Sequence, residues 1–259
     1  MPDSPAFDTD RFAGALQTTA LGRDFRYVLE TPSTMDLART AAADGAPHGT
    51  LILAEAQTAG RGRRGRGFFS PPGGSLYFTL ILRPSRDAYG RLPLAVPLAV
   101  CQACAHEGVD ARIKWPNDIW VGERKLCGML IDGETGPGGL TAYAGIGINV
   151  NADPTAADAL RDTATSLARE LGREVGRESL LARICDQLEG AMDAPEAELV
   201  DAYRAVSLVL GRLITVEEPE GAYEARALEI APDGALVVER EGGERLTVLA
   251  ADVSVRPGA

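Results

Sequence analysis

Short apolar runs separated by turn residues occupy much of the first 150 positions of the chain. Residues 50–54 and 76–82 are continuous apolar runs of strand length. Strand character also occurs at residues 27–30, 111–115, 119–121, 125–131 and 141–150. A short glycine-containing turn joins residues 119–121 to 125–131, which predicts a β-hairpin there. The pattern therefore predicts a sheet built from many strands.

Helical periodicity alternates with these strands. Amphipathic or apolar helical patterns predict helices over residues 35–43, 92–107, 163–171, 177–192 and 196–206. The first of these follows Ser33 and Thr34, whose hydroxyls can cap a helix. The free amides at that helix start offer a pocket for a polar or anionic ligand group, although a plain N-cap explains the same residues.

The pattern changes after residue 210. Short alternating strands follow at 213–217, 222–230, 236–239 and 245–248, with turns that contain glycine between them. This spacing predicts a small β-barrel. We therefore expect two domains, one over residues 1–210 and a small one over residues 211–259.

Composition narrows the class of protein. The chain has 259 residues, a formal net charge of −11 and a sequence pI near 4.8, which argues against an extended nucleic-acid-binding face. No apolar run approaches the roughly 20 residues of a membrane span, and residues 1–11 lack a signal-peptide pattern, so we expect a cytoplasmic protein without membrane partners. The four cysteines are expected to be reduced and structural, since Cys101 and Cys104 have no second such pair to complete a metal site.

One basic segment contrasts with this acidic background. Residues 60–67, here called the arginine loop, combine four glycines with four arginines between two predicted strands. Glycine lets a backbone approach a ligand closely, and arginine can grip a carboxylate or phosphate in two places. The loop therefore indicates an anion clamp; a nonspecific RNA-binding finger and a solvated surface turn are the alternatives.

A second constellation lies further along the chain. Residues 114–118 (KWPND) lead from a predicted strand into a turn. Gly145, Gly147 and Asn149 alternate along the strand at 141–150, so three small or polar side chains share one face of the sheet. We expect another group to approach the sheet closely there.

Four motifs in this order resemble the biotin protein ligases. They are QTAGRGRRGR at 57–66, KWPND at 114–118, KLCG at 125–128 and GIGIN at 145–149. Residues 165–167 and the closing barrel are also similar, so the resemblance spans about residues 27–257. It implies an α+β fold, with a mixed β-sheet and packed helices followed by a small SH3-like β-barrel.

The resemblance also implies a two-step reaction. Biotin and ATP would form biotinyl-5'-AMP with release of pyrophosphate, and biotin would then pass to one lysine of a biotin carboxyl carrier domain. Adenylation needs no covalent enzyme nucleophile, which agrees with a chain that has no Walker A or GxSxG sequence and only two histidines. ATP and Mg²⁺ would be required, and a homodimer is possible in this family.

Matching positions suggest the site residues. The catalytic cations would be Lys125, Arg61 and Arg63. Biotin would contact Ser33, Thr34, Gln57, Arg61, Gly62, Arg63, Lys125 and Gly128, and ATP would contact Arg63, Arg64, Arg66, Phe68, Lys114, Asn117 and Asn149. Asp118 would hold the magnesium ion, and Gly62 and Gly65 would let the loop order on binding.

The chain differs from the family pattern in two respects, and one other enzymatic activity has to be considered. Phe68 stands where related chains often carry a tryptophan that covers the adenine, so stacking is expected without the indole donor. Only about 26 residues precede the first predicted strand, which predicts a ligase without the helix-turn-helix domain of some members and without DNA as a partner. The nearest rival activity is that of a lipoate or octanoate ligase or transferase.

Overall fold

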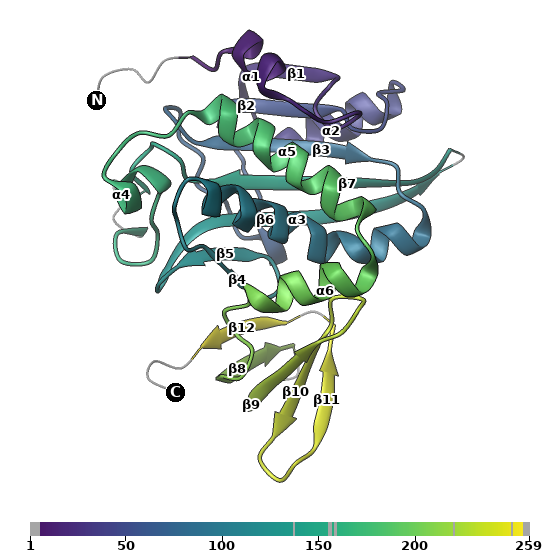
Figure 1. Cartoon of the computed structure of the whole chain (residues 1–259), viewed down its shortest axis with the longest axis vertical. Coiled ribbons are helices and arrows are strands. Elements are labelled where there is room, and N and C mark those ends of the chain that lie inside the picture. The colour runs from purple at the N-terminus through teal and green to yellow at the C-terminus, as the bar shows by residue number, and fades with distance from the viewer. Residues whose placement is uncertain are drawn as a thin grey trace.

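A large mixed sheet with helices on both faces forms most of the molecule, and a smaller antiparallel sheet lies beside it (Figure 1). The computed structural model describes residues 6–136, 138–154, 157, 160–219, 221–249 and 251–255. The strands of the large sheet are β1 (Phe25–Thr31), β2 (Leu51–Gln57), β3 (Leu76–Leu82), β4 (Arg112–Lys114), β5 (Asp118–Val121), β6 (Arg124–Gly136) and β7 (Gly139–Ile148). The helices are α1 (Thr9–Ala15), α2 (Thr34–Ala43), α3 (Arg86–His106), α4 (Leu167–Leu171), α5 (Arg177–Asp193) and α6 (Glu196–Ala205), with a short 3₁₀ turn η1 (Arg63–Gly65).

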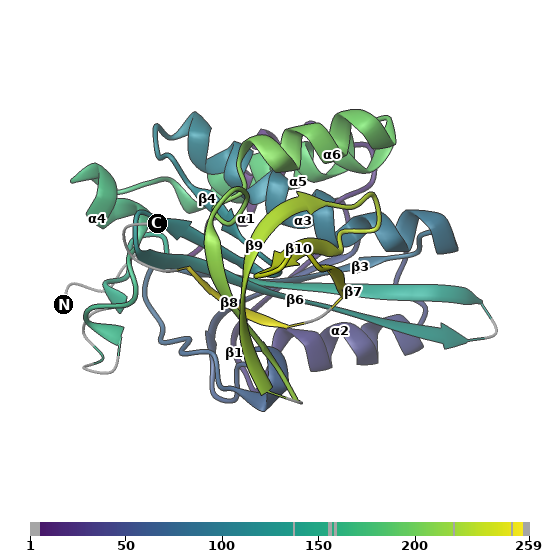
Figure 2. The ribbon, with the colours of Figure 1, turned by 90° about the horizontal axis from the view of Figure 1, so that it is seen from below.

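The seven strands follow the order β1-β2-β3-β7-β6-β5-β4. β1 and β2 run parallel, and every other neighbouring pair is antiparallel. Side chains of a strand alternate between the two faces, so Leu51 and Leu53 pack toward α3 and α5 while Ile52 packs toward α2. Figure 2 shows α2 on the opposite side of the sheet from α3 and α5. Both faces are covered, which explains why β3 is buried along its whole length.

The smaller sheet has the order β11-β10-β9-β8-β12 and is antiparallel throughout. Its strands are β8 (Leu213–Glu218), β9 (Gly221–Ile230), β10 (Leu236–Arg240), β11 (Arg245–Val248) and β12 (Asp252–Val255). Alternate residues such as Ile214, Val216 and Val238 are buried and continue the core of the large sheet. The Trp115 indole donates a 2.9 Å hydrogen bond to the Gly234 carbonyl, which ties the two sheets together. This architecture confirms the expected α+β fold class; the exact domain boundary at residue 210 stays a prediction.

Most predicted elements are confirmed, and the exceptions have physical causes. Residues 163–165 were predicted to be helical, but they pair with Lys125 instead. The Lys125 amide donates to the Thr163 carbonyl at 2.8 Å, and the Thr165 amide donates to the Lys125 carbonyl at 2.9 Å. α3 begins at residue 86 rather than 92, because the Ser85 hydroxyl caps it by accepting from the Ala88 amide. α1 and β12 were not predicted. None of the helices in the described ranges is long and apolar enough to cross a membrane.

Buried carboxylates attach the N-terminal segment to the large sheet and to α5. Glu55 of β2 accepts from the Phe7 amide, from the Tyr27 hydroxyl and from both terminal nitrogens of Arg177. The side chains of Arg177 and Glu55 are only 6% and 13% exposed. Burial alone would raise the pKa of Glu55, but the hydrogen bond and charge of Arg177, together with the hydrogen bonds from Tyr27 and Phe7, hold the pKa below the ordinary value of 4.5. The pair therefore stabilises the folded chain only while Glu55 is ionised.

We expect Arg177→Met to lower the free energy of unfolding by about 3 kcal/mol at pH 7, because Glu55 would remain buried without a cation. Urea denaturation measures this difference. The pKa of Glu55 is lower in the folded state than in the unfolded state. The ion pair therefore contributes fully to stability at a pH above the pKa of the unfolded state. This contribution is lost as the pH falls through the pKa of the folded state. The difference between wild type and variant should therefore shrink in acid. Adding Glu55→Gln should recover part of the loss, and an Arg177→Met protein as stable as wild type would contradict the assignment.

Candidate functional site

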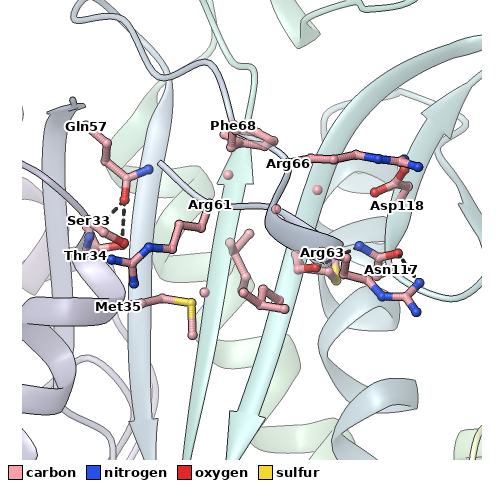
Figure 3. Close-up of a pocket in the computed structure, with 18 of the residues that line it drawn as sticks. Ser33, Thr34, Met35, Gln57, Arg61, Arg63, Arg66, Phe68, Asn117 and Asp118 are labelled. Atoms are coloured by element: carbon pink, nitrogen blue, oxygen red, sulfur yellow. Dashed lines mark hydrogen bonds between the residues drawn. The ribbon is translucent and has the colours of Figure 1, made fainter. Parts of the chain in front are cut away.

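A cavity opens on the face of the large sheet that carries α2, beneath the arginine loop (Figure 3). Its wall comes from the start of α2, the end of β2, the arginine loop, the β5–β6–β7 strands and β12. Among its lining residues are twelve of the predicted site residues: Ser33, Thr34, Gln57, Arg61, Gly62, Arg63, Arg66, Phe68, Asn117, Asp118, Lys125 and Gly128. The chain thus brings together segments that are far apart in sequence.

One end of the cavity presents the neutral polar groups of Thr34 and Gln57, and the Arg61–Asp36 ion pair lies beside them. The Gln57 side-chain carbonyl accepts from the Thr34 amide at 2.9 Å and from the Thr34 hydroxyl at 3.1 Å (Figure 3). The Gln57 amide donates to the Ser70 hydroxyl, and the Thr79 hydroxyl donates to that of Thr34. Ser33 occupies the N-cap position of α2, but its side chain makes no capping hydrogen bond, which corrects the predicted hydroxyl cap. Gln57 supplies the acceptor at the start of this helix instead, because β2 ends beside it.

The opposite end is cationic, and each cation there has a carboxylate partner. The Lys125 amine lies 2.7 Å from Asp118. Arg66 lies 2.7 Å from Asp252 of β12, while Arg63 donates to the Asn117 side chain at 3.2 Å. Burial lowers the pKa of the Arg63 guanidinium, and the charge of Asp252 acts in the opposite direction. An incoming anion would therefore exchange for carboxylates of the chain itself.

The arginine loop has a defined conformation over the cavity. Its two ends pair between Arg61 and Gly67, and the Gly62 amide donates to the Arg66 carbonyl at 2.7 Å. Arg61 forms two 2.7 Å hydrogen bonds with Asp36 in the first turn of α2. Arg64 has φ of 54°, a left-handed conformation that costs a residue with a side chain roughly 1–2 kcal/mol. Contacts of the loop must offset this cost.

Glycines form the floor of the cavity. Gly128 of β6 and Gly147 of β7 face each other in the sheet, and Phe68 lies over both. A Cβ atom on Gly147 would lie 2.3 Å from the Phe68 ring, and one on Gly145 would lie 2.8 Å from the Met35 sulfur. The expected close approach at this strand is therefore confirmed, and the approaching groups are side chains of the chain itself.

Three predicted residues do not line this cavity. Asn149 lines a second, mainly apolar cavity, which shares Gly67, Phe68 and Lys125 with the first and also includes Phe69 and Tyr77. The Lys114 amine lies 4.1 Å from the centre of the Trp120 ring, and burial lowers its pKa. Arg64 turns to the smaller sheet, where it donates to the Glu217 carbonyl. The roles predicted for these three residues stay predictions.

Sequence reasoning missed Asp36, Thr79 and Asp252. Asp36 follows the Ser33-Thr34 pair closely and could have been found as an acidic residue in the first turn of a predicted helix. Thr79 is a polar residue within an otherwise apolar strand, which is also a readable signal. Asp252 lies 186 positions after Arg66, and no local pattern indicates that the two residues meet. The described part of the chain contains no group of three or more His, Cys, Asp or Glu side chains placed to hold a metal ion.

Comparisons with known proteins agree with this geometry. A model described as "Biotin/lipoate A/B protein ligase family" matches residues 27–151, and one described as "Biotin protein ligase C terminal domain" matches residues 209–256. The "Bifunctional ligase/repressor BirA" of Bacillus subtilis is 30% identical over 249 residues, which cover 93% of this chain and 76% of that protein. A biotin acetyl-CoA-carboxylase ligase of Mycobacterium tuberculosis is 32% identical over 243 residues, which cover 89% of this chain and 88% of that protein.

A solved structure extends the similarity to three dimensions. The biotin protein ligase of Aquifex aeolicus in complex with biotin and ATP matches with a TM-score of 0.73 and 27% identity, over 90% of this chain and 99% of that one. The large sheet, its cavity and the closing small sheet thus define an α+β ligase fold. The chain belongs to the biotin protein ligase family.

We expect Gly147→Ala to displace the Phe68 ring, because the new methyl group would overlap it. Overpacking of this kind should lower the free energy of unfolding by about 1–3 kcal/mol, measured by chemical denaturation. Phe68→Ala in the same background should remove most of that cost. Gly190→Ala in α5 is the matched control, since nothing lies within 4 Å of its Cβ position. Equal stability of the Gly147→Ala and wild-type proteins would show that the ring moves freely.

Proposed function

We propose that this chain is an ATP-dependent biotin protein ligase that forms biotinyl-5'-AMP and transfers biotin to a lysine of a biotin carboxyl carrier domain. One observation carries the proposal: a single cavity has neutral hydrogen-bonding groups, those of Thr34 and Gln57, at one end and the cations Lys125, Arg63 and Arg66 at the other. Biotin likewise has a neutral ureido group at one end and a carboxylate at the other. The two ends of the cavity suit the two ends of that molecule.

The polar end favours biotin over a plain acyl chain. Thr34 and Gln57 are already hydrogen-bonded to each other, and Thr79 and Ser70 extend the network on both sides. A ligand that lacked polar groups would leave the remaining capacity of these buried groups unsatisfied. Sites of this kind discriminate strongly against analogues that cannot hydrogen-bond. Lipoate and octanoate lack a ureido group, so we expect both to be poor substrates.

The second cavity is our candidate for the nucleotide base. Its walls are mainly apolar, with Phe69, Pro71 and Tyr77 among them and Asn149 as a polar group. Phe68 and Lys125 line both cavities, so a molecule that joined biotin to a nucleotide would pass them. Phe68 would thus contact the nucleotide in place of the tryptophan common in related chains, and Lys125 would lie where carboxylate and α-phosphate meet.

The cations of the cavity would stabilise the negative charge that develops during adenylation of biotin. As the biotin carboxylate approaches the α-phosphorus, negative charge develops on the phosphate oxygens and on the departing pyrophosphate. Lys125 would exchange its contact with Asp118 for these oxygens, and Arg63 and Arg66 would neutralise the pyrophosphate. Asp118, freed from Lys125, is a carboxylate of the kind that holds Mg²⁺ together with substrate phosphates, and the ion would supply further charge neutralisation. The arginine loop would exclude water from the reactive anhydride.

The proposal also covers the acceptor of biotin, the oligomeric state and the location of the protein. A relative in Mycobacterium tuberculosis is named for ligation to acetyl-CoA carboxylase, which supports a carboxylase carrier domain as the acceptor. A cytoplasmic location and independence from DNA are further parts of the proposal, and a homodimer is one of the two oligomeric states, with the monomer, that the sequence leaves open. Sedimentation with and without biotin and ATP would measure the oligomeric state.

Native mass spectrometry after incubation with biotin, ATP and magnesium would test the proposal directly. Bound biotinyl-AMP is the expected result, with octanoate and lipoate offered in parallel. Lys114 and Lys125 are the only lysines of the chain, and only Lys125 lines the cavity, so any self-acylated lysine would be easily located. An octanoyl or lipoyl adenylate in place of the biotinyl one would retain the reaction class and refute the substrate.

We expect Lys125→Ala to fold normally and to form biotinyl-AMP about a hundredfold more slowly or worse, because one electrostatic stabiliser of the developing charge is lost. Pyrophosphate release under saturating biotin and ATP measures this step. Arg245→Ala is the control, since Arg245 lies on the exposed strand β11 and pairs with Glu239 outside the cavity. An unchanged rate for Lys125→Ala would remove this residue from the mechanism.

A further inference from the structure

Lys125 lies where the regular pairing of β6 ends. The pairing of β6 with β7 begins at Cys127, so Lys125 lies beyond the end of β7. On the other side of β6, the register with β5 shifts between the pairs that Cys127 and Lys125 form. The ladder with β7 therefore does not fix the backbone of the lysine that lines both cavities.

A segment from further along the chain pairs with this backbone instead. The Lys125 amide donates to the Thr163 carbonyl at 2.8 Å, and the Lys125 carbonyl accepts from the Thr165 amide at 2.9 Å. These bonds form a parallel bridge between Lys125 and Ala164, which is buried. The position of Lys125 in the cavities therefore depends on residues 163–165 remaining in place.

Glu170 of α4 holds this segment at its end. Its Oε1 atom accepts from the Thr165 hydroxyl and, at 2.9 Å, from the Arg124 guanidinium. Thr165 is fully buried and the Glu170 side chain is 17% exposed, so the bond between them is shielded from water and strengthened by the low local dielectric. Arg124 immediately precedes Lys125 in β6. One carboxylate thus binds both the chain neighbour of Lys125 and the segment that pairs with its backbone.

We propose that Glu170 is a positioning residue that acts through Lys125. By holding Arg124 and Thr165 together, it fixes the backbone of the lysine and hence the place of the amine. The described residues that line the two cavities do not include Glu170, so a ligand there would not touch it. A displacement of about 1 Å in a reacting group can slow a reaction by about a hundredfold. The role in adenylation rests on the proposed function, whereas the attachment of residues 163–165 does not.

Hydrogen exchange of the Lys125 amide tests the attachment. Lys114 and Lys125 are the only lysines, so protein labelled with ¹⁵N-lysine gives one backbone amide signal from each, and Lys114→Arg identifies them. We expect Glu170→Ala to speed exchange of the Lys125 amide about tenfold, because its hydrogen bond to Thr163 would open more often. Exchange at Lys114 should stay unchanged, which a general loss of stability would not produce.

The rate of biotinyl-AMP formation tests the positioning. Glu170→Ala should lower kcat for pyrophosphate release about tenfold and leave the KM for biotin within about twofold, because a misplaced amine stabilises the developing charge less well. In a Lys125→Ala background the same change should have little further effect, since Glu170 acts through that lysine. Glu170→Gln keeps the Oε1 acceptor and should restore the rate to within about twofold of wild type.

Glu107→Ala is the matched control. The Glu107 side chain is 19% exposed and pairs with Arg173, which follows α4, so it resembles Glu170 in exposure and in the type of partner. Arg173 is not a chain neighbour of Lys125, so this variant should change neither the exchange nor the rate. Thr165→Val removes only the hydroxyl and should change both in the same direction as Glu170→Ala, should that variant fail to fold. Thermal unfolding establishes that each variant is folded at the temperature of the assays.

Unchanged exchange at Lys125 in Glu170→Ala would overturn the attachment. Faster exchange with an unchanged kcat would overturn the positioning role, and so would a full tenfold loss of rate in the Lys125→Ala background. If wild type formed no biotinyl-AMP, the proposed function and the role of Glu170 in adenylation would fail together. Faster exchange in the variant would still support the attachment in that case.

Discussion

The cavity exists because two strands in the middle of the sheet lack side chains where they face each other. Gly128 and Gly147 are cross-strand partners, and Gly145 continues the same face of β7. The Phe68 ring, the Lys125 side chain and the Met35 sulfur all lie within about 3 Å of positions that a Cβ atom would occupy. The site therefore depends on glycines that leave room for Phe68, Lys125 and Met35 to lie directly against the sheet.

Charge balance is the second constraint. A partly buried cation without a partner is costly, so a ligand-free anion site must find carboxylates within its own chain. Asp36, Asp118 and Asp252 supply them from α2, β5 and β12. This explains how an acidic protein accommodates a loop of four arginines. These ion pairs also connect the cavity to the smaller sheet through Asp252.

Elements defined by local patterns were predicted well. The nearly continuous apolar run of β3 and the amphipathic pattern of α5 match their observed structures, and the turn after Trp115 was expected from its proline and asparagine. The predicted helix over 163–171 was wrong in its first half, because pairing with Lys125 overrides the helical pattern. The predicted Ser33 cap failed for a similar reason, since Gln57 arrives from another strand and supplies the acceptor. Both of these errors occur where a distant segment competes with a local preference.

The sequence by itself determined most strands and helices and the arginine loop, because these are local properties, and the resemblance of its motifs to the biotin protein ligases supplied the fold class and most residues of the cavity. The alternation of Gly145 and Gly147 even indicated the close approach at the sheet. Only the tertiary structure decided which charges meet. Arg66 and Asp252 are separated by 186 positions, and their contact depends on how the smaller sheet packs beside the large one. Ion pairs across such separations leave no periodic signal in a sequence, so the link between the arginine loop and the C-terminal sheet could be found only in three dimensions.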